Sequence, residues 1–170
     1  VINRAKSAGV ERVYLPNIDD TTIDALLDVC TKYAGYCFPM LGFHPTSVDD
    51  NSMVKVLKMR NLLVEGHPYV GIGEVGLDLY WDKTYLNEQK KVFEEQIQWA
   101  LEWDLPLIIH CRDAFPELFD VMSPYKKTAL SGIFHSFTGT KAEAVELLEY
   151  PNFMIGINGV VTFKKSNLPE

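Results

Sequence analysis

The chain has 170 residues, of which 47% are hydrophobic and 23% charged, a composition that is typical of one folded domain and excludes an intrinsically disordered chain. No apolar run approaches the about 18 residues that a membrane span requires, so we expect no membrane partner. The net charge of −7 argues against a broad basic surface for nucleic acid, although bound metal ions can supply positive charge inside a cleft.

Short apolar segments alternate with longer amphipathic segments along the whole chain. This alternation predicts strands and helices that follow one another in turn. The strands are expected at residues 12–16, 37–42, 69–74, 106–110, 132–137 and 152–158. The helices between them are expected at residues 20–34, 52–65, 84–103, 113–122 and 140–148.

The order of these elements predicts an α/β fold with a parallel sheet, because a helix between two strands returns the chain to the same end of the sheet. Two architectures fit this order: an open doubly wound sheet and a (β/α)8 TIM barrel. A complete barrel needs eight strands and roughly 250 residues, so a barrel of six strands would be incomplete. Length alone favours the open sheet.

The three cysteines, Cys30, Cys37 and Cys111, show no C-x-x-C spacing. An odd number of widely spaced cysteines favours reduced thiols over a disulfide framework. The first residues lack the apolar stretch of a signal peptide, and the chain begins with Val1 instead of Met, which fits processing or a piece of a longer protein. We therefore expect a cytoplasmic protein.

Four side chains that can carry chemistry stand at the ends of the apolar segments: His44, Glu74, His110 and His135. The carboxyl ends of parallel strands meet at one edge of a sheet, where functional groups gather. One such histidine is usually a hydrogen-bonded structural residue, but three histidines and a carboxylate together form a ligand set for Zn²⁺, Mn²⁺ and related ions. The pattern predicts a metal site at this edge.

A second pattern overlaps this site. Residues 71–76 match G-x-G-x-x-G, the fingerprint of dinucleotide-binding proteins. In those proteins a helix begins at the glycines and directs its N-terminus at a pyrophosphate, whereas here the next helical pattern begins only near Thr84. The Glu74 carboxylate would also repel the phosphates. We therefore reject a dinucleotide site.

The segment around His110 also contains Cys111 and Arg112. Adjacent side chains of a strand point to opposite faces, so His110 and Cys111 are not expected to form a nucleophile–base pair. Arg112 shares the face of His110 and could reach a phosphate.

Four segments in the same order, residues 42–45, 73–78, 110–114 and 135–139, resemble motifs of the TatD family of metal-dependent DNases. They read Gly-Phe-His-Pro, Gly-Glu-Val-Gly-Leu-Asp, His-Cys-Arg-Asp-Ala and His-Ser-Phe-Thr-Gly. Residues 159–164 also resemble the segment after the seventh strand of that family. The resemblance covers nearly the whole chain, and four ordered motifs make it specific.

The resemblance implies a TIM barrel of the metallo-dependent hydrolase superfamily that cleaves DNA phosphodiester bonds, exonuclease-like, on single strands or 3′ ends. The water would be activated by two divalent ions, Mg²⁺, Mn²⁺ or Zn²⁺. The residue that matches Glu74 is the catalytic residue and bridges both ions, and those that match His110 and His135 hold one of them. His44 and Arg112 would contact the substrate phosphate.

The chain departs from the family pattern at two points. It contains neither the H-x-H motif of the first strand nor the E-T-D motif of the last strand. The resemblance therefore implies a monomeric single domain over residues 1–170, truncated at both ends, with an incomplete barrel of about six strands. We expect this chain alone to bind one ion weakly and to have negligible nuclease activity.

Two other functions remain open at this point. A related amidohydrolase would use similar chemistry on an amide, ester or lactone, since ligands at strand ends do not distinguish phosphorus from carbon. A scaffold that has kept the motifs but lost the site would be non-catalytic.

Overall fold

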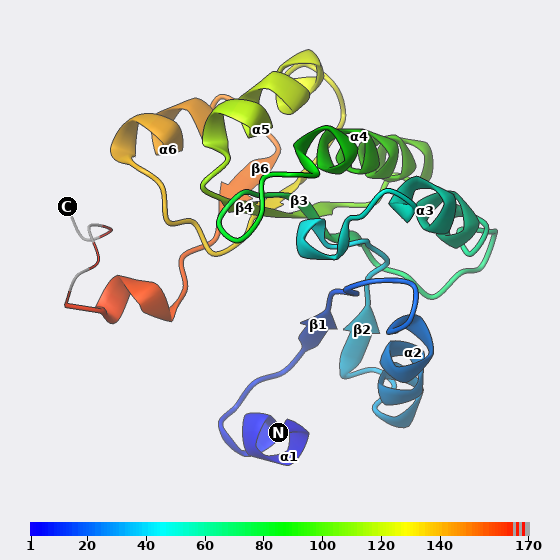
Figure 1. The fold of residues 1–170 in the computed structure, drawn as a ribbon. Coiled ribbons are helices and arrows are strands. Elements are labelled where there is room, and N and C mark those ends of the chain that lie inside the picture. Colours follow the sequence, from blue (N-terminus) through cyan, green and yellow to red (C-terminus); the bar gives the residue numbers. More distant parts are fainter. Residues whose placement is uncertain (165, 167, 169–170) are drawn as a thin grey trace.

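The computed structural model describes residues 1–164, 166 and 168. Strands and helices alternate through most of it (Figure 1). The strands are β1 (Val13–Leu15), β2 (Cys37–Pro39), β3 (Ile72–Asp78), β4 (Leu107–Arg112), β5 (Gly132–Phe134) and β6 (Phe153–Ile155). The helices are α1 (Ile2–Ser7), α2 (Ile23–Lys32), α3 (Ser52–Arg60), α4 (Leu86–Trp103), α5 (Phe115–Met122) and α6 (Lys141–Leu147). Three short 3-10 turns are η1 (Pro45–Ser47), η2 (Ser123–Tyr125) and η3 (Gly159–Thr162).

All strand pairs are parallel, as the sequence predicts. β1 pairs with β2, and β3, β4, β5 and β6 form a four-stranded sheet in that order. A single parallel bridge between Leu41 and Ile72 connects the two sheets. The spatial order of the strands therefore follows the chain, whereas a doubly wound sheet reverses its order at a switch point. The fold is of the TIM-barrel type, and the sheets do not close within the described residues.

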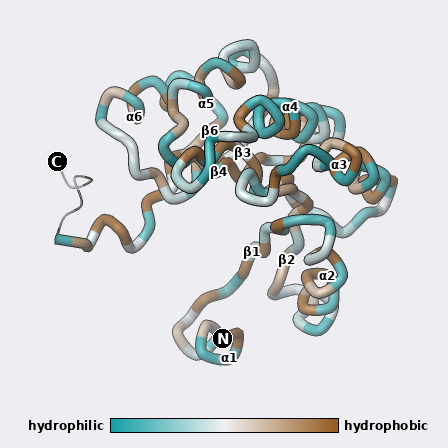
Figure 2. The backbone as a smooth tube through the Cα atoms, viewed as in Figure 1, coloured by the Kyte–Doolittle hydropathy of each residue, from teal (hydrophilic) through white to brown (hydrophobic). Residues whose placement is uncertain are grey.

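The longest helix, α4, packs against β3, whereas α5 packs against β3 and β4 and α6 against β6. The apolar stripe predicted from the sequence is buried there, with Phe93, Ile97 and Ala100 at most 2% exposed. Figure 2 shows teal and brown segments alternating along this helix, as expected when only one side faces the core. Trp99 is fully buried and belongs to the same hydrophobic core.

The strand boundaries differ from the predicted ones at two places that matter for function. β3 continues past Glu74 to Asp78, and β4 continues past His110 to Arg112. The alternating apolar residues Val75 and Leu77 are fully buried, so burial extends the strand beyond the charged residue at which the prediction stopped. Glu74 and His110 therefore lie within strands and not at their ends.

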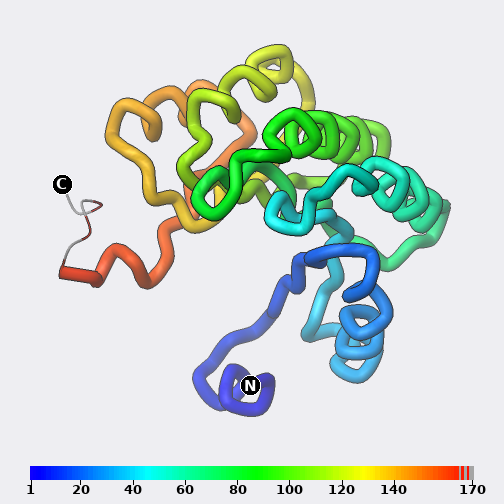
Figure 3. Tube along the Cα trace, viewed as in Figure 1, coloured from blue at the N-terminus to red at the C-terminus, as the bar shows by residue number. Residues whose placement is uncertain are grey.

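Other differences are local. Helix α1 was not predicted, and none of its residues is buried. β5 ends at Phe134, so His135 lies just beyond it. Figure 3 follows the chain from the blue N-terminal segment through green α4 to orange β6. No helix among residues 1–164, 166 and 168 is both long and apolar enough to cross a membrane.

Candidate metal centre

Glu74 is held at the centre of the site by the backbone on both sides of β3. Its N–H donates a hydrogen bond to the carbonyl of Asn17 at 3.2 Å, and the N–H of Asn17 donates to Gly73 at 3.0 Å. On the other side, Gly76 pairs with His110 of β4. Gly76 has φ +128°, and a Cβ there would collide with the His110 carbonyl oxygen. Glycine at this position thus lets β3 and β4 approach closely.

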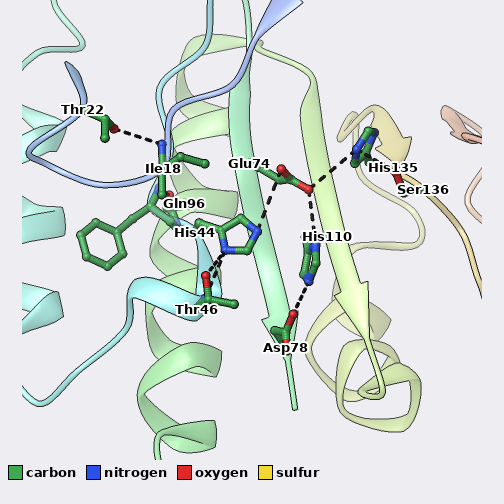
Figure 4. Close-up of polar contacts among 11 residues, drawn as sticks. Ile18, Thr22, His44, Thr46, Glu74, Asp78, Gln96, His110, His135 and Ser136 are labelled. Carbon is green, nitrogen blue, oxygen red and sulfur yellow. Dashed lines mark hydrogen bonds and ion pairs between the residues drawn. The ribbon is translucent and has the colours of Figure 1, made fainter. Parts of the chain in front are cut away.

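Three imidazoles surround the Glu74 carboxylate (Figure 4). Its Oε1 lies 3.4 Å from Nδ1 of His110 and 4.0 Å from Nε2 of His135, and its Oε2 lies 4.0 Å from Nε2 of His44. The structure therefore brings together the three residues that the resemblance places on the metal, and adds His44, which it places on the substrate. His44, Glu74 and His110 each offer a donor atom within 4.8 Å of the others, close enough to hold one metal ion.

These side chains differ in exposure. The side chains of His44, Glu74 and His110 are 12%, 14% and 20% exposed, whereas that of His135 is 48% exposed. His135 is also within 2.8 Å of the hydroxyl of Ser136 through the same Nε2 that faces Glu74. The site thus has a largely buried side at His44 and a half-exposed side at His135, from which solvent can enter.

The pKa values follow from this partial burial and from mutual contacts. Burial opposes ionisation of Glu74, but the hydrogen bond to His110 and the charges of the three histidines outweigh it and lower its pKa. Burial likewise opposes protonation of His110, but the hydrogen bonds to Glu74 and Asp78 outweigh it and raise its pKa. Burial and the nearby His110 lower the pKa of His44. At neutral pH Glu74 is therefore an anion, and the imidazole of His44 is neutral.

Asp78 is the residue that the sequence analysis missed. It is 4% exposed, and its Oδ2 lies 2.7 Å from Nε2 of His110. Its backbone N–H and carbonyl are both hydrogen-bonded to the buried side chain of Gln89, at 2.9 and 3.0 Å. When the His110 imidazole is neutral, the Asp78 carboxylate accepts its Nε2–H, and Nδ1 is then free to offer a lone pair to a metal ion. Residues 74, 76 and 78 alternate along β3, and alternate residues of a strand point to the same face. This spacing could have placed Asp78 beside Glu74.

His44 has the opposite arrangement. It caps η1, and its Nδ1 accepts a hydrogen bond from the backbone N–H of Thr46 at 3.2 Å. Because a neutral imidazole has one N–H, the acceptor role of Nδ1 places the proton on Nε2, toward Glu74. His44 is therefore suited to donate a hydrogen bond, while His110 is suited to offer a lone pair.

Arg112 and Cys111 lie on β4 beside His110. The guanidinium carbon of Arg112 is 3.5 Å from the ring centroid of Tyr80. Among the ion pairs of residues 1–164, 166 and 168, none joins Arg112 to Glu74. Removal from water raises the pKa of the Cys111 thiol to about 12, so the thiol stays protonated and is a poor nucleophile.

Curated relatives and solved structures resemble this chain over nearly its whole length. It is 35% identical over 170 residues to the protein named "Uncharacterized metal-dependent hydrolase YabD" of Bacillus subtilis, covering 100% of this chain and 66% of that protein. It is 30% identical over 161 residues to the "3'-5' ssDNA/RNA exonuclease TatD" of Erwinia billingiae, covering 95% and 61%. The chain thus spans less than two thirds of the length of these relatives.

Solved structures show the fold. The crystal structure of YJJV, a TatD homolog from Escherichia coli K12, superposes with a TM-score of 0.82 at 24% identity, covering 98% of this chain and 64% of that one. An amidohydrolase from Saccharomyces cerevisiae superposes with a TM-score of 0.73 at 19% identity, covering 93% and 59%. The sequence profile described as "TatD related DNase" matches residues 1–170. The chain belongs to the TatD-related DNase family.

Proposed function

We propose that this chain carries the metal-binding centre of a hydrolase that cleaves phosphodiester bonds in single-stranded nucleic acid, from 3′ ends. The observation that supports this most directly is the position of Glu74 Oε1, 3.4 Å and 4.0 Å from imidazole nitrogens of His110 and His135. The name of the Erwinia billingiae relative, a 3'-5' ssDNA/RNA exonuclease, supports the choice of substrate.

The donor set fits a divalent cation. Glu74, His110 and His135 would hold it through a carboxylate oxygen and two imidazole nitrogens, ligands that Zn²⁺ and Mn²⁺ accept. His44 also has a donor atom within 4.8 Å of those of Glu74 and His110, but its Nε2 carries the proton and offers no lone pair to an ion. The Asp78–His110 hydrogen bond supports this assignment, because histidines that bind metals commonly donate their other N–H to a carboxylate. The second oxygen of Glu74, Oε2, lies 4.0 Å from Nε2 of His44, so it would be available to a second ion in the whole protein.

When bound, a divalent cation supplies positive charge for the phosphoryl oxygens and lowers the pKa of water. The chain's own residues would orient the substrate. His44 would donate its Nε2–H to a phosphate oxygen, since Nδ1 is occupied by Thr46. Arg112 would supply a fixed positive charge, because its guanidinium is held against the ring of Tyr80.

The test begins with metal binding by the 170-residue chain, measured by isothermal titration calorimetry with Mn²⁺. We expect binding that Glu74→Gln abolishes and that the matched control Glu65→Gln retains, since Glu65 is an exposed residue of a turn.

Cleavage is then measured in the longest natural protein that contains the chain, on labelled single-stranded DNA and on a carboxylic ester. Absence of Mn²⁺ binding, or Glu74-dependent cleavage of the ester but not of the DNA, would overturn the proposal.

A further inference from the structure

A hollow of about 210 Å³ lies between η1 and the segment that joins β3 to α4. Thr46, Asp78, Trp81, Asp82 and Tyr85 are among its lining residues. We propose that this hollow binds the nucleobase of the nucleotide whose phosphate lies at the candidate metal centre. The inference rests on the proposed function, and it names the part of the substrate that this segment recognises.

The first argument is position. Two lining residues also hold imidazoles of the centre: Thr46 is bonded to His44, and Asp78 to His110. The hollow therefore begins one side chain away from the metal centre. A nucleotide joins its base to its phosphate through a single sugar, so a phosphate beside His44 and His110 brings its own base to this hollow.

The second argument is the aromatic surface. Trp81 is 75% exposed, an unusual exposure for the largest apolar side chain. Its ring is held edge-on against Tyr80 at a centroid distance of 4.6 Å, and Arg112 covers the ring of Tyr80. Trp81 thus presents an open ring at a fixed place, and aromatic rings of this kind stack on bases of any sequence.

The third argument is charge. Two carboxylates, Asp78 and Asp82, line the hollow, so a phosphate would be repelled from it. Asp78 already accepts hydrogen bonds from His110 and from the backbone N–H of Tyr80, so the exposed Asp82 is the carboxylate that can accept one from the amino group of a base, such as N4 of cytosine. Arg112, whose guanidinium carbon is 5.8 Å from the Trp81 ring centroid, offers the positive charge that a phosphate needs outside the hollow. The distribution of charge therefore suits a nucleotide whose base lies inside the hollow and whose phosphate lies outside it.

The experiment measures binding of two probes to the 170-residue chain in the presence of EDTA: a short single-stranded DNA of mixed sequence and an abasic strand with the same number of phosphates. Fluorescence anisotropy of a 5′ label reports affinity. We expect the chain to prefer the base-bearing strand and Trp81→Ala to weaken its binding about 5- to 150-fold, which corresponds to the loss of one stacked base. Binding of the abasic strand should stay within about twofold, because phosphate contacts are retained.

Two further variants complete the design. Trp81→Phe keeps an aromatic ring and should restore most of the affinity. Phe163→Ala removes another exposed aromatic residue, 64% exposed and outside the hollow, and should leave affinity unchanged. The proposal is overturned if Trp81→Ala weakens both strands equally or neither, or if Phe163→Ala has the same effect. This outcome is separate from failure of the proposed function, which would leave base-dependent binding intact while metal binding or cleavage is absent.

Discussion

Among single residues, Asp78 decides which nitrogen of His110 faces Glu74. Its Oδ2 lies 2.7 Å from Nε2 of His110, and its own backbone is fixed by Gln89. Because Asp78 is nearly fully buried, this carboxylate cannot turn away into solvent. The orientation of the His110 ring is therefore set before any ligand arrives.

We expect Asp78→Asn to weaken Mn²⁺ binding roughly 10- to 100-fold, the usual effect of removing a partner of a metal-binding histidine. The amide keeps the shape of the carboxylate but loses the anion that holds the Nε2–H of His110. Isothermal titration calorimetry measures the change. Asp82→Asn is the matched control, because the Asp82 carboxylate accepts a hydrogen bond from the backbone N–H of Thr84 and not from His110. Equal losses in the two variants would contradict a specific role of Asp78.

At the level of elements, β3 carries the site because it is packed tightly between its neighbours. On one side, the carbonyl of Gly73 accepts a hydrogen bond from the backbone N–H of Asn17. On the other side, Gly73 and Gly76 lie directly against β4. These close approaches leave no room for Cβ atoms. The two glycines that resemble part of a nucleotide-binding fingerprint are thus required by strand packing.

Gly76→Ala should lower the free energy of unfolding by about 1–3 kcal/mol or more, since alanine at φ +128° is strained and its Cβ would meet the His110 carbonyl. Urea denaturation followed by circular dichroism measures this. Gly159→Ala is the matched control, because its Cβ would point into open space. A Gly76→Ala variant as stable as Gly159→Ala would show that β3 and β4 can separate without cost.

The order and type of most elements could be predicted from the sequence, since apolar periodicity depends on local burial. The ends of β3 and β4 could not, because the apolar segments that predict these strands stop at the polar residues Glu74 and His110, whereas the strands continue to Asp78 and Arg112. Glu74 and His110 are tolerated inside strands only because several strands place polar partners around them. Such contacts join residues that are far apart in the sequence: Asp78 lies 32 residues before His110, which explains why this pair was missed.

At the scale of the whole molecule, the six strands of the described residues are parallel and follow the chain order without closing. Beside β6, helices α5 and α6 border a cavity of about 1200 Å³ lined by apolar side chains such as Phe115, Phe137 and Phe153. Tyr150 packs edge-on against Phe134 and Phe153 at this end. Its hydroxyl has no hydrogen-bond partner among the described residues, so an aromatic cluster with one unsatisfied polar atom stabilises this end.

This cluster makes stability depend on pH. Burial, with the nearby Glu146 and Glu149, raises the pKa of Tyr150 to about 12, above the usual value of about 10. The folded chain thus binds this proton more tightly than the unfolded chain, so the contribution is complete below about pH 10 and is lost as the pH rises toward 12.

Tyr150→Phe should leave the free energy of unfolding at neutral pH unchanged or higher by up to about 1 kcal/mol, because it removes an unpaired buried hydroxyl. At alkaline pH the variant should lose less stability than the native chain. Urea denaturation across this pH range measures both effects. Tyr14→Phe, at a half-exposed position, should lose as much stability at alkaline pH as the native chain. An identical loss of stability in the native chain and both variants would show that Tyr150 is not the group responsible.

Glu74 and His110 come from β3 and β4, and His135 follows β5 directly. A cation shared by the three would therefore fasten consecutive segments of the sheet across their backbone ladders. Binding of the ion would then be linked to folding of the sheet. Above the dissociation constant, each tenfold increase in free ion would add about 1.4 kcal/mol to the free energy of unfolding. Adding the ion would therefore raise the melting temperature, and a chelator would reverse that gain.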